Sequence, residues 1–103
     1  MHEFHGCCHC GNLEVDYKTT IAAKDATVRA SQCSFCRKHE ARAISEPAGT
    51  IEITVHDPAL LQRYRFGIGV IEFLICRKCG IYVSAYTRHG DQAYANVMVN
   101  VLD

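Results

Sequence analysis

Two pairs of closely spaced cysteines, far apart along the chain, constrain its fold more than any other sequence feature. Cys8 and Cys10 stand in "GCCHCG" at C-x-C spacing, where an extended backbone would let both thiolates approach one ion. Cys76 and Cys79 stand in "ICRKCG" at C-x-x-C spacing. There Gly80 permits the turn of a metal-binding knuckle, whose backbone N–H groups can point at the sulfurs. We expect these four cysteines to hold one structural zinc ion.

Such an ion would supply a large part of the stability of the domain. A structural zinc contributes on the order of 10–16 kcal/mol of apparent binding free energy in small metallo-domains, whereas a whole domain is stable by only about 5–15 kcal/mol. The ion would also join the two ends of the chain, because residues 8 and 79 enclose most of its length. The alternative interpretation is four unrelated buried cysteines that pack as small hydrophobic residues.

The composition is typical of one globular domain, and we assign it to residues 1–103. Hydrophobic residues make up 49% of the chain and charged residues 21%, and the formal net charge is zero. This balance argues against nucleic acid or an anionic membrane as the main partner. The N-terminal "MHEFHGCCHCG" has no apolar signal region, so we expect a cytoplasmic protein whose seven cysteines serve metal binding or thiol chemistry.

Alternating apolar residues and runs of β-branched residues predict short strands and almost no helix. One helical turn is expected within "HDPALLQRY", where Asp57 can cap the N-terminus and Pro58 fits the first position. The sequence therefore predicts an all-β fold with a small core. The stronger predicted strands cover residues 13–17, 50–56, 70–76, 81–87 and 94–102, and the weaker ones cover 27–31 and 41–45.

A third group of candidate residues lies in the central stretch "SQCSFCRKH", residues 31–39. Cys33 and Cys36 have the spacing of a second metal half-site, with Ser31 before them and His39 after them. The same pair could instead be a redox dithiol. The sequence does not predict the strand-then-helix setting in which C-x-x-C is usually redox-active, so this interpretation ranks last.

Several of these motifs, in this order, resemble the glutathione-dependent formaldehyde-activating enzyme family. The similarity extends from Gly6 to Asp103 and is carried by "GCCHCG", "CSFCRKH", "YRFGIGVIEFLICRKCGIY" and "NVMVNVLD". It implies an all-β fold of several short coiled antiparallel sheets, of the Mss4-like type, stapled by a structural zinc. It assigns that zinc to Cys8, Cys10, Cys76 and Cys79. It also implies a second, catalytic zinc on a central C-x-C-x-x-C triad, and a carbon–sulfur lyase activity that joins glutathione and formaldehyde to S-hydroxymethylglutathione.

The chain departs from this family pattern at Ser31, which stands where the first cysteine of the triad is expected. A zinc ligand must be deprotonated, and a serine hydroxyl meets that requirement far less easily than a thiol. We therefore predict a weak second metal site on Cys33 and Cys36. His39 or Cys7 could supply a third ligand. The alternative interpretation of His39 is an exposed histidine without a role in the site, and that of Cys7 is a core residue or a free thiol.

Two functions follow as expectations from the motifs and the resemblance. In the first, the domain is a carbon–sulfur lyase in which Cys33 and Cys36 are catalytic and the partner is a small thiol such as glutathione. Its carboxylates would need cationic donors, and Arg37, Lys38 and Arg42 are the nearest candidates, unless they form a solvated charged loop. In the second, the domain is a zinc-stabilised, non-catalytic binding module with a degenerate second metal site.

Overall fold

The computed structural model describes residues 1–30, 33–46, 48–90 and 92–103 and confirms the all-β prediction. Its strands are β1 (His2–Cys7), β2 (Leu13–Thr19), β3 (Arg29–Ala30), β4 (Arg42–Ile44), β5 (Thr50–Val55), β6 (Leu61–Tyr64), β7 (Ile71–Cys76), β8 (Tyr82–His89) and β9 (Gln92–Met98). The helical segments are the short α-helix α1 (Ser34–Lys38) and the 3-10 turns η1 (Ala23–Asp25), η2 (Pro58–Leu60) and η3 (Val99–Val101). None of the helices in the described part of the chain has the length and apolar character needed to cross a bilayer.

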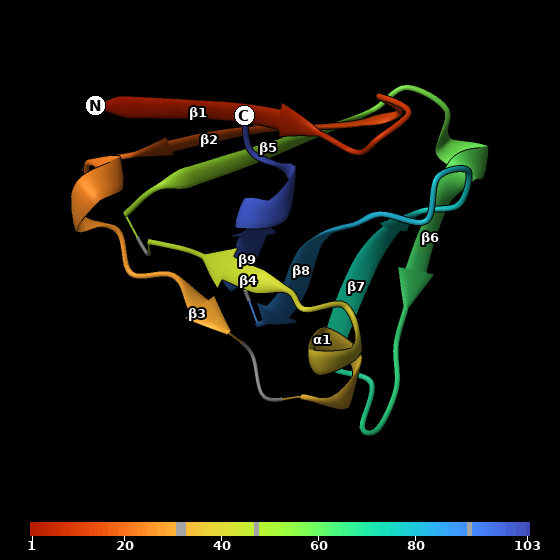
Figure 1. Cartoon of the computed structure of the whole chain (residues 1–103). Coiled ribbons are helices and arrows are strands. Elements are labelled where there is room, and N and C mark those ends of the chain that lie inside the picture. The colour runs from red at the N-terminus through yellow and green to blue at the C-terminus, as the bar shows by residue number, and fades with distance from the viewer. Residues whose placement is uncertain (31–32, 47, 91) are drawn as a thin grey trace.

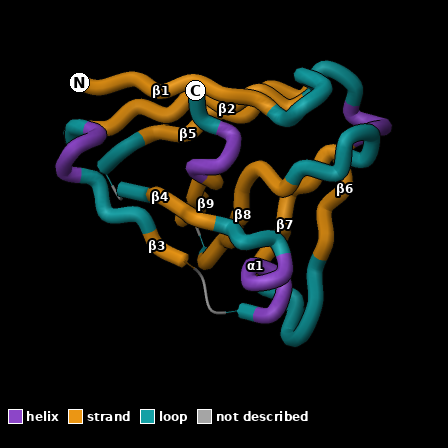
Figure 2. Tube along the Cα trace, viewed as in Figure 1, coloured by secondary structure: helices purple, strands orange, loops and turns teal. Residues whose placement is uncertain are grey.

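The described strands form two antiparallel sheets. The smaller sheet has the order β1-β2-β5 and lies across the top of Figure 1, and the larger has the order β3-β4-β9-β8-β7-β6 and lies below it. Their registers place Val15 opposite Gly6 on one side and opposite Ile53 on the other. Figure 2 shows that loops and turns connect the strands almost throughout, with helix confined to short segments.

One hydrophobic core fills the space between the two sheets. Leu13, Val15 and Tyr17 alternate on β2, and all three are buried, as their period-two spacing predicts. They belong to the same cluster as Val83 of β8 and Val97 of β9. The second, smaller cluster surrounds α1 and consists of Cys36, Ala41, Ala43, Phe73, Tyr82 and Met98.

Local patterns located most strands but missed elements that depend on distant partners. The expected helical turn shrinks to η2, where the Asp57 side chain accepts from the Ala59 N–H at 3.0 Å as the predicted cap. The chain then enters β6 directly, because its residues 61–64 pair with β7. β1 and α1 were also missed, and the last part of the predicted strand 94–102 forms η3. The predicted strand 27–31 is reduced to β3, and its end at residue 31 lies outside the described residues.

The C-terminal segment is attached to β1. Gly6 forms an isolated antiparallel bridge with Leu102, and the Asp103 N–H donates to the His5 carbonyl at 2.9 Å. A Cβ atom at Gly6 would lie 1.9 Å from the Val101 carbonyl oxygen, so no side chain fits between these backbones. The close approach requires glycine at this position.

We predict that Gly6→Ala lowers the free energy of unfolding by roughly 1–3 kcal/mol, because the added methyl group must push the C-terminal segment away from β1. Chemical denaturation measures the loss. His2→Ala, at an exposed position of the same strand, is the control and should have little effect. Equal stability of the two variants would contradict the close packing at Gly6.

Candidate functional site

Four cysteine sulfurs meet where β1 and β7 end. Cys8 and Cys10 lie in the turn that follows β1, Cys76 ends β7, and Cys79 lies in the next turn. The Cys8 and Cys10 Sγ atoms are 3.7 Å apart, and those of Cys10 and Cys76 are 3.5 Å apart. All four sulfurs lie within 4.8 Å of one another. The predicted grouping of these cysteines is therefore confirmed, and the cluster could hold a metal ion.

The first pair converges through a turn and not along a straight strand, so the expected extended geometry was wrong. The Cys8 N–H donates to the Leu13 carbonyl at 2.9 Å, and the Gly11 N–H donates to the Cys8 carbonyl at 3.1 Å. Gly11 has φ of 86°, which a residue with a side chain rarely adopts. The hairpin between β1 and β2 brings the two sulfurs together.

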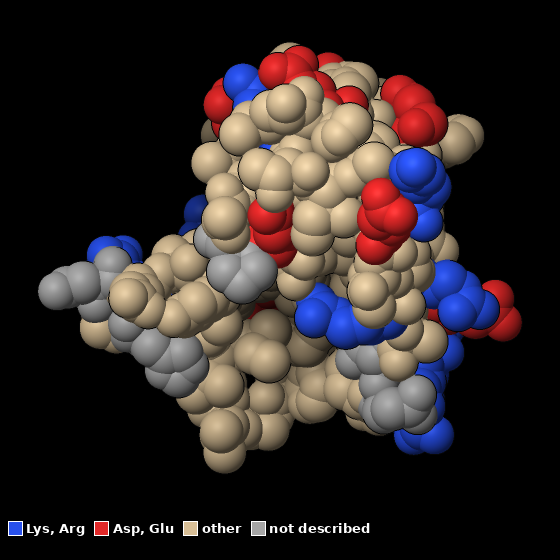
Figure 3. Space-filling model, turned by 90° about the vertical axis from the view of Figure 1, so that its left-hand side faces the viewer, with Lys and Arg blue, Asp and Glu red and all other residues tan. Residues whose placement is uncertain are grey.

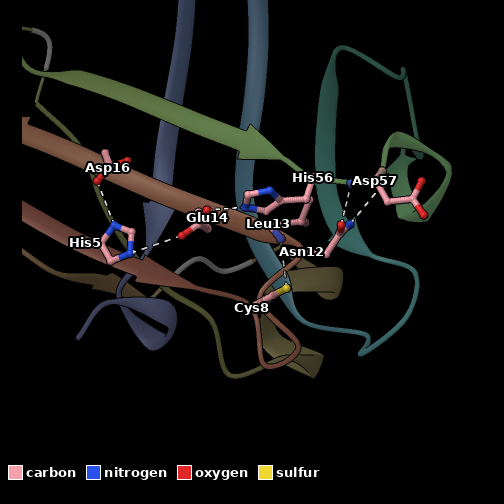
Figure 4. A network of polar contacts seen from close by, with 8 residues as sticks. All are labelled: His5, Cys8, Asn12, Leu13, Glu14, Asp16, His56 and Asp57. Carbon is pink, nitrogen blue, oxygen red and sulfur yellow. Dashed lines mark hydrogen bonds and ion pairs between the residues drawn. The ribbon is translucent and has the colours of Figure 1, made fainter.

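Backbone N–H groups point at the sulfurs, as the knuckle motif predicts. The Cys79 N–H lies 3.5 Å from Cys76 Sγ, and Gly80 closes the turn at φ of 80°. In the first half-site the Leu13 N–H lies 3.3 Å from Cys8 Sγ (Figure 4). These donors stabilise thiolates and orient them toward a shared centre.

The spacing of the sulfurs fits tetrahedral coordination. Four thiolates about 2.3 Å from a central ion would lie about 3.8 Å from one another, and the two measured separations are 3.7 and 3.5 Å. Cys8 and Cys76 are buried, Cys79 is half-buried and Cys10 is exposed, so an ion here would be shielded on most sides. A closed, four-sulfur site of this kind is typical of a structural metal.

The neighbours of the sulfurs shift two thiols in opposite directions. Burial raises the pKa of Cys79, but the backbone N–H groups of Cys10 and Ile81 and the nearby thiols outweigh it and bring that pKa to about 6. The Asn12 N–H lowers the pKa of Cys10, but burial and the thiol of Cys76 outweigh it and raise that pKa to about 11. At neutral pH the metal-free cluster therefore keeps a proton on Cys10 that a metal must displace.

We predict that metal affinity rises with pH between about pH 6 and pH 8. Each proton displaced at a thiol whose pKa lies above this range makes binding about tenfold tighter per pH unit. Cys10 meets this condition, whereas Cys79, with a pKa of about 6, is already largely ionised over the same range. Competition with a chelator of known affinity measures the slope, and an affinity independent of pH would contradict the prediction.

We predict that Cys79→Ala unfolds the domain or makes it insoluble, because three sulfurs leave the ion incompletely held. Loss of a structural metal removes on the order of 10 kcal/mol in small metallo-domains, which is comparable to the whole stability of the fold. Cys7→Ala is the matched control, because Cys7 is an exposed, free thiol next to the cluster and not part of it. Thermal melts of both variants provide the test, and a Cys79→Ala protein as stable as Cys7→Ala would refute the structural role.

The central cysteines form a second, separate feature at the start of α1. The Cys33 sulfur accepts from the Cys36 N–H at 3.3 Å and caps the helix, while Cys36 is buried with Sγ 3.7 Å from the Tyr82 hydroxyl oxygen. Cys33 and Cys36 both line a cavity of about 390 Å³. Ser31 lies outside the described residues. Within the described residues, the four-sulfur cluster is the only group of three or more metal-ligating side chains.

Apolar side chains form most of the wall of this cavity. Tyr82 also lines the cavity, and burial raises the pKa of its hydroxyl above the ordinary value, with the Cys36 thiol adding to the shift. The hydroxyl therefore remains protonated. The apolar lining comes from β4, β7, β8, β9 and the β6–β7 loop, and includes Ala43, Phe66, Ile71, Phe73, Ala85 and Met98.

The residues proposed to complete or support the central site lie outside the cavity lining. The His39 ring packs at a tilt against Phe35 and edge-on against Tyr82, with centroid distances of 4.5 and 5.7 Å respectively. The three basic residues considered for a thiol partner, Arg37, Lys38 and Arg42, are exposed and do not line the cavity. Cys7 is an exposed, free cysteine, which agrees with the free-thiol interpretation and not with the core position. The packing that builds the cavity had no signal in the sequence.

The N-terminal histidines His2, His5 and His9 are exposed. His5 Nδ1 lies 2.9 Å from Asp16, and this hydrogen bond is the main reason why the pKa of His5 is raised. Its other ring nitrogen lies 3.8 Å from Glu14, which also contacts His56 (Figure 4). Figure 3 shows both acidic and basic side chains on one face of the molecule, so neither sign of charge covers that face alone.

Comparison with known proteins gives one informative similarity. No family model matches the chain, and no curated protein matches it. A crystal structure of a Rhodobacter sphaeroides protein from a structural genomics programme is 30% identical, with a TM-score of 0.73. The alignment covers 96% of this chain and 87% of the other. The name of that protein states no activity.

Proposed function

The chain belongs to the same family as this Rhodobacter sphaeroides protein, and from its own site we propose that it is a zinc-stabilised domain that binds a small thiol or thiol adduct. The zinc is structural and is held by the four-sulfur cluster. The ligand occupies the cavity beside Cys33 and Cys36. The observation that supports this proposal is the separation of the cysteines into two groups. Four of them surround a common centre, and Cys33 and Cys36 line a cavity.

Zinc is the metal that best fits the first group. Four thiolates in tetrahedral arrangement favour zinc or an iron centre, whereas calcium and magnesium require oxygen ligands. Zinc needs no redox chemistry from its surroundings, and its role here is to hold the β1–β2 turn against the end of β7. The proposal places the protein in a reducing compartment, where the thiols remain available to the metal.

A second candidate function is the carbon–sulfur lyase activity of the formaldehyde-activating family. What favours it is the presence of two thiols and a protonated phenol in the cavity lining, with Cys36 Sγ 3.7 Å from the Tyr82 hydroxyl. In that reaction a thiol sulfur forms a bond to the carbonyl carbon of formaldehyde while the C=O π bond breaks. The oxygen then takes a proton, which Tyr82 is placed to donate, and the phenolate regains it from the thiol or from water.

The sequence at position 31 favours binding over catalysis. A neutral serine hydroxyl offers zinc little where the family pattern has a thiolate. With Cys33 and Cys36 as its only thiols, the central site is a poor zinc site, and the domain then works as a binding module. The lyase interpretation requires a third ligand that replaces the missing cysteine.

We predict one zinc per chain in the natural protein and slow or absent adduct formation from glutathione and formaldehyde. Ser31→Cys should raise the zinc content toward two per chain, because it restores a third thiolate. Ser45→Cys, the same substitution at a position that does not line the cavity, should leave the content at one. Metal analysis and a thiol-adduct assay on the three proteins make the comparison. Two zincs and rapid adduct formation in the natural protein would refute the binding module and favour the lyase.

A further inference from the structure

The cavity beside the central cysteines carries no charged side chain among the described residues that line it. Three of its polar residues lie next to one another: the Cys36 N–H contacts Cys33 Sγ at 3.3 Å, and Tyr82 Oη lies 3.7 Å from Cys36 Sγ. Asn96 also lines the cavity, and its side-chain carbonyl accepts from the Ala85 N–H at 3.0 Å. A ligand would therefore meet thiols and a phenol and no fixed charge.

The rest of the wall is shaped for an apolar body. The rings of Phe66 and Phe73 stack with centroids 5.3 Å apart, and the buried Met98 lies in the same lining. Aromatic rings and a thioether bind apolar groups, including other rings, through close and polarisable contacts. An ionised carboxylate placed here would lose its hydration without gaining a cationic partner, which is strongly unfavourable.

Part of the cavity lining is exposed to solvent and has the same apolar character. Ile68 and Val70 of the β6–β7 loop are 90% and 51% exposed, and Ile71 at the start of β7 is 40% exposed. Large apolar side chains that stay in water next to a cavity are a mark of a binding site. They favour a ligand whose outer surface is also apolar.

The arginines nearest to this loop belong to another cavity. Arg63, Arg65 and Arg88 line a space of about 420 Å³ around Glu72, which shares only Gly69 and Val70 of the loop with the first cavity. Glu72 and Phe73 are consecutive on β7, so their side chains point to opposite faces of the sheet. Arg63 and Arg65 both pair with the buried Glu72 carboxylate, at 3.7 Å for Arg63. Their charge is therefore directed away from the cysteine cavity.

We propose that the cavity beside Cys33 and Cys36 selects a small, uncharged, mainly apolar carbonyl compound or thiol, and not a charged peptide thiol such as glutathione. This inference rests on the proposed function and names the ligand class for the same site. The polar end of the ligand meets the thiols and the Tyr82 hydroxyl, and its apolar body lies against Phe66, Phe73 and Met98. A volume of about 390 Å³ is at the lower end of the range for small-molecule sites.

A matched pair of probes tests the ligand class on the metal-loaded full chain. 4-Methylacetophenone and 4-methylbenzoate share the ring and the methyl group, and differ in that one ends in an uncharged ketone and the other in a carboxylate. NMR of the Met98 methyl group follows their binding in every variant without requiring any reaction at sulfur, and the Val70 methyl groups add a second signal wherever Val70 is retained. We expect saturable shifts with the ketone and binding of the benzoate at least tenfold weaker.

Adding a charge to the wall tests the cause of the selectivity. Ile71→Lys places an ammonium group at a lining position that is 40% exposed and so accommodates it. The preference for the ketone should fall at least tenfold or reverse, because the carboxylate gains a partner. Ile21→Lys is the control, since Ile21 is 36% exposed and lies outside the cavity lining. Val70→Lys, at 51% exposure, replaces the first variant if Ile71→Lys fails to fold.

The outcomes separate this inference from the proposed function. Tighter binding of the benzoate to the natural protein overturns the ligand class and leaves the cavity as a binding site. Failure of both probes to shift the Met98 methyl group overturns the ligand class together with the cavity's role in the proposed function. An unchanged preference in folded Ile71→Lys and Val70→Lys overturns the charge argument. The expected pattern in the natural protein, in Ile71→Lys (or its replacement Val70→Lys) and in Ile21→Lys supports the inference.

Discussion

The contact among four sulfurs at the end of β1 and the end of β7 is the constraint on which the rest of the fold depends. Cys10 and Cys76 are 66 positions apart: Cys10 lies in the turn between β1 and β2 of the smaller sheet, and Cys76 ends β7 of the larger sheet. Closing so long a loop costs conformational entropy, and a chain of 103 residues has a limited core with which to offset it. A metal held by both half-sites would supply the missing free energy at the point where the sheets meet.

The four-sulfur cluster also positions the cavity, because β7 and β8, which meet at the cluster's knuckle, both carry side chains of the cavity wall. β7 carries Phe73 in the cavity wall and ends at Cys76 in the cluster. The knuckle then returns the chain through a hydrogen bond from the Cys76 N–H to the Ile81 carbonyl at 3.0 Å, and Tyr82 begins β8 immediately afterwards. A disturbance of the cluster would therefore move two of the side chains that shape the cavity. The cluster and the cavity wall are physically coupled through one turn.

How much of this was predictable follows from how far apart the interacting residues lie. The strand around Leu13, Val15 and Tyr17 and the half-sites are local patterns, so the sequence alone predicted them. The cavity brings together α1, β4, β7–β9 and the β6–β7 loop, and no local spacing encodes such a meeting. Residues 61–64 were expected to lie in a helical turn, but they form β6. Their pairing with β7 outweighs the local preference. The Cys8–Cys10 pair was correctly grouped for an incorrect reason, since a turn joins it.

The serine at position 31 and the uncharged cavity are consistent with each other in electrostatic terms. Three thiolates around a zinc ion would carry a net charge of about −1, and an apolar wall of Phe66, Phe73 and Met98 offers it no compensation. Tyr82 stays protonated because burial raises its pKa, and the described side chains that line the cavity include no Lys, Arg, Asp or Glu. A cavity of this kind needs no bound cation to be stable. With serine and not cysteine at position 31, this apolar cavity would accept an uncharged ligand without a desolvation penalty.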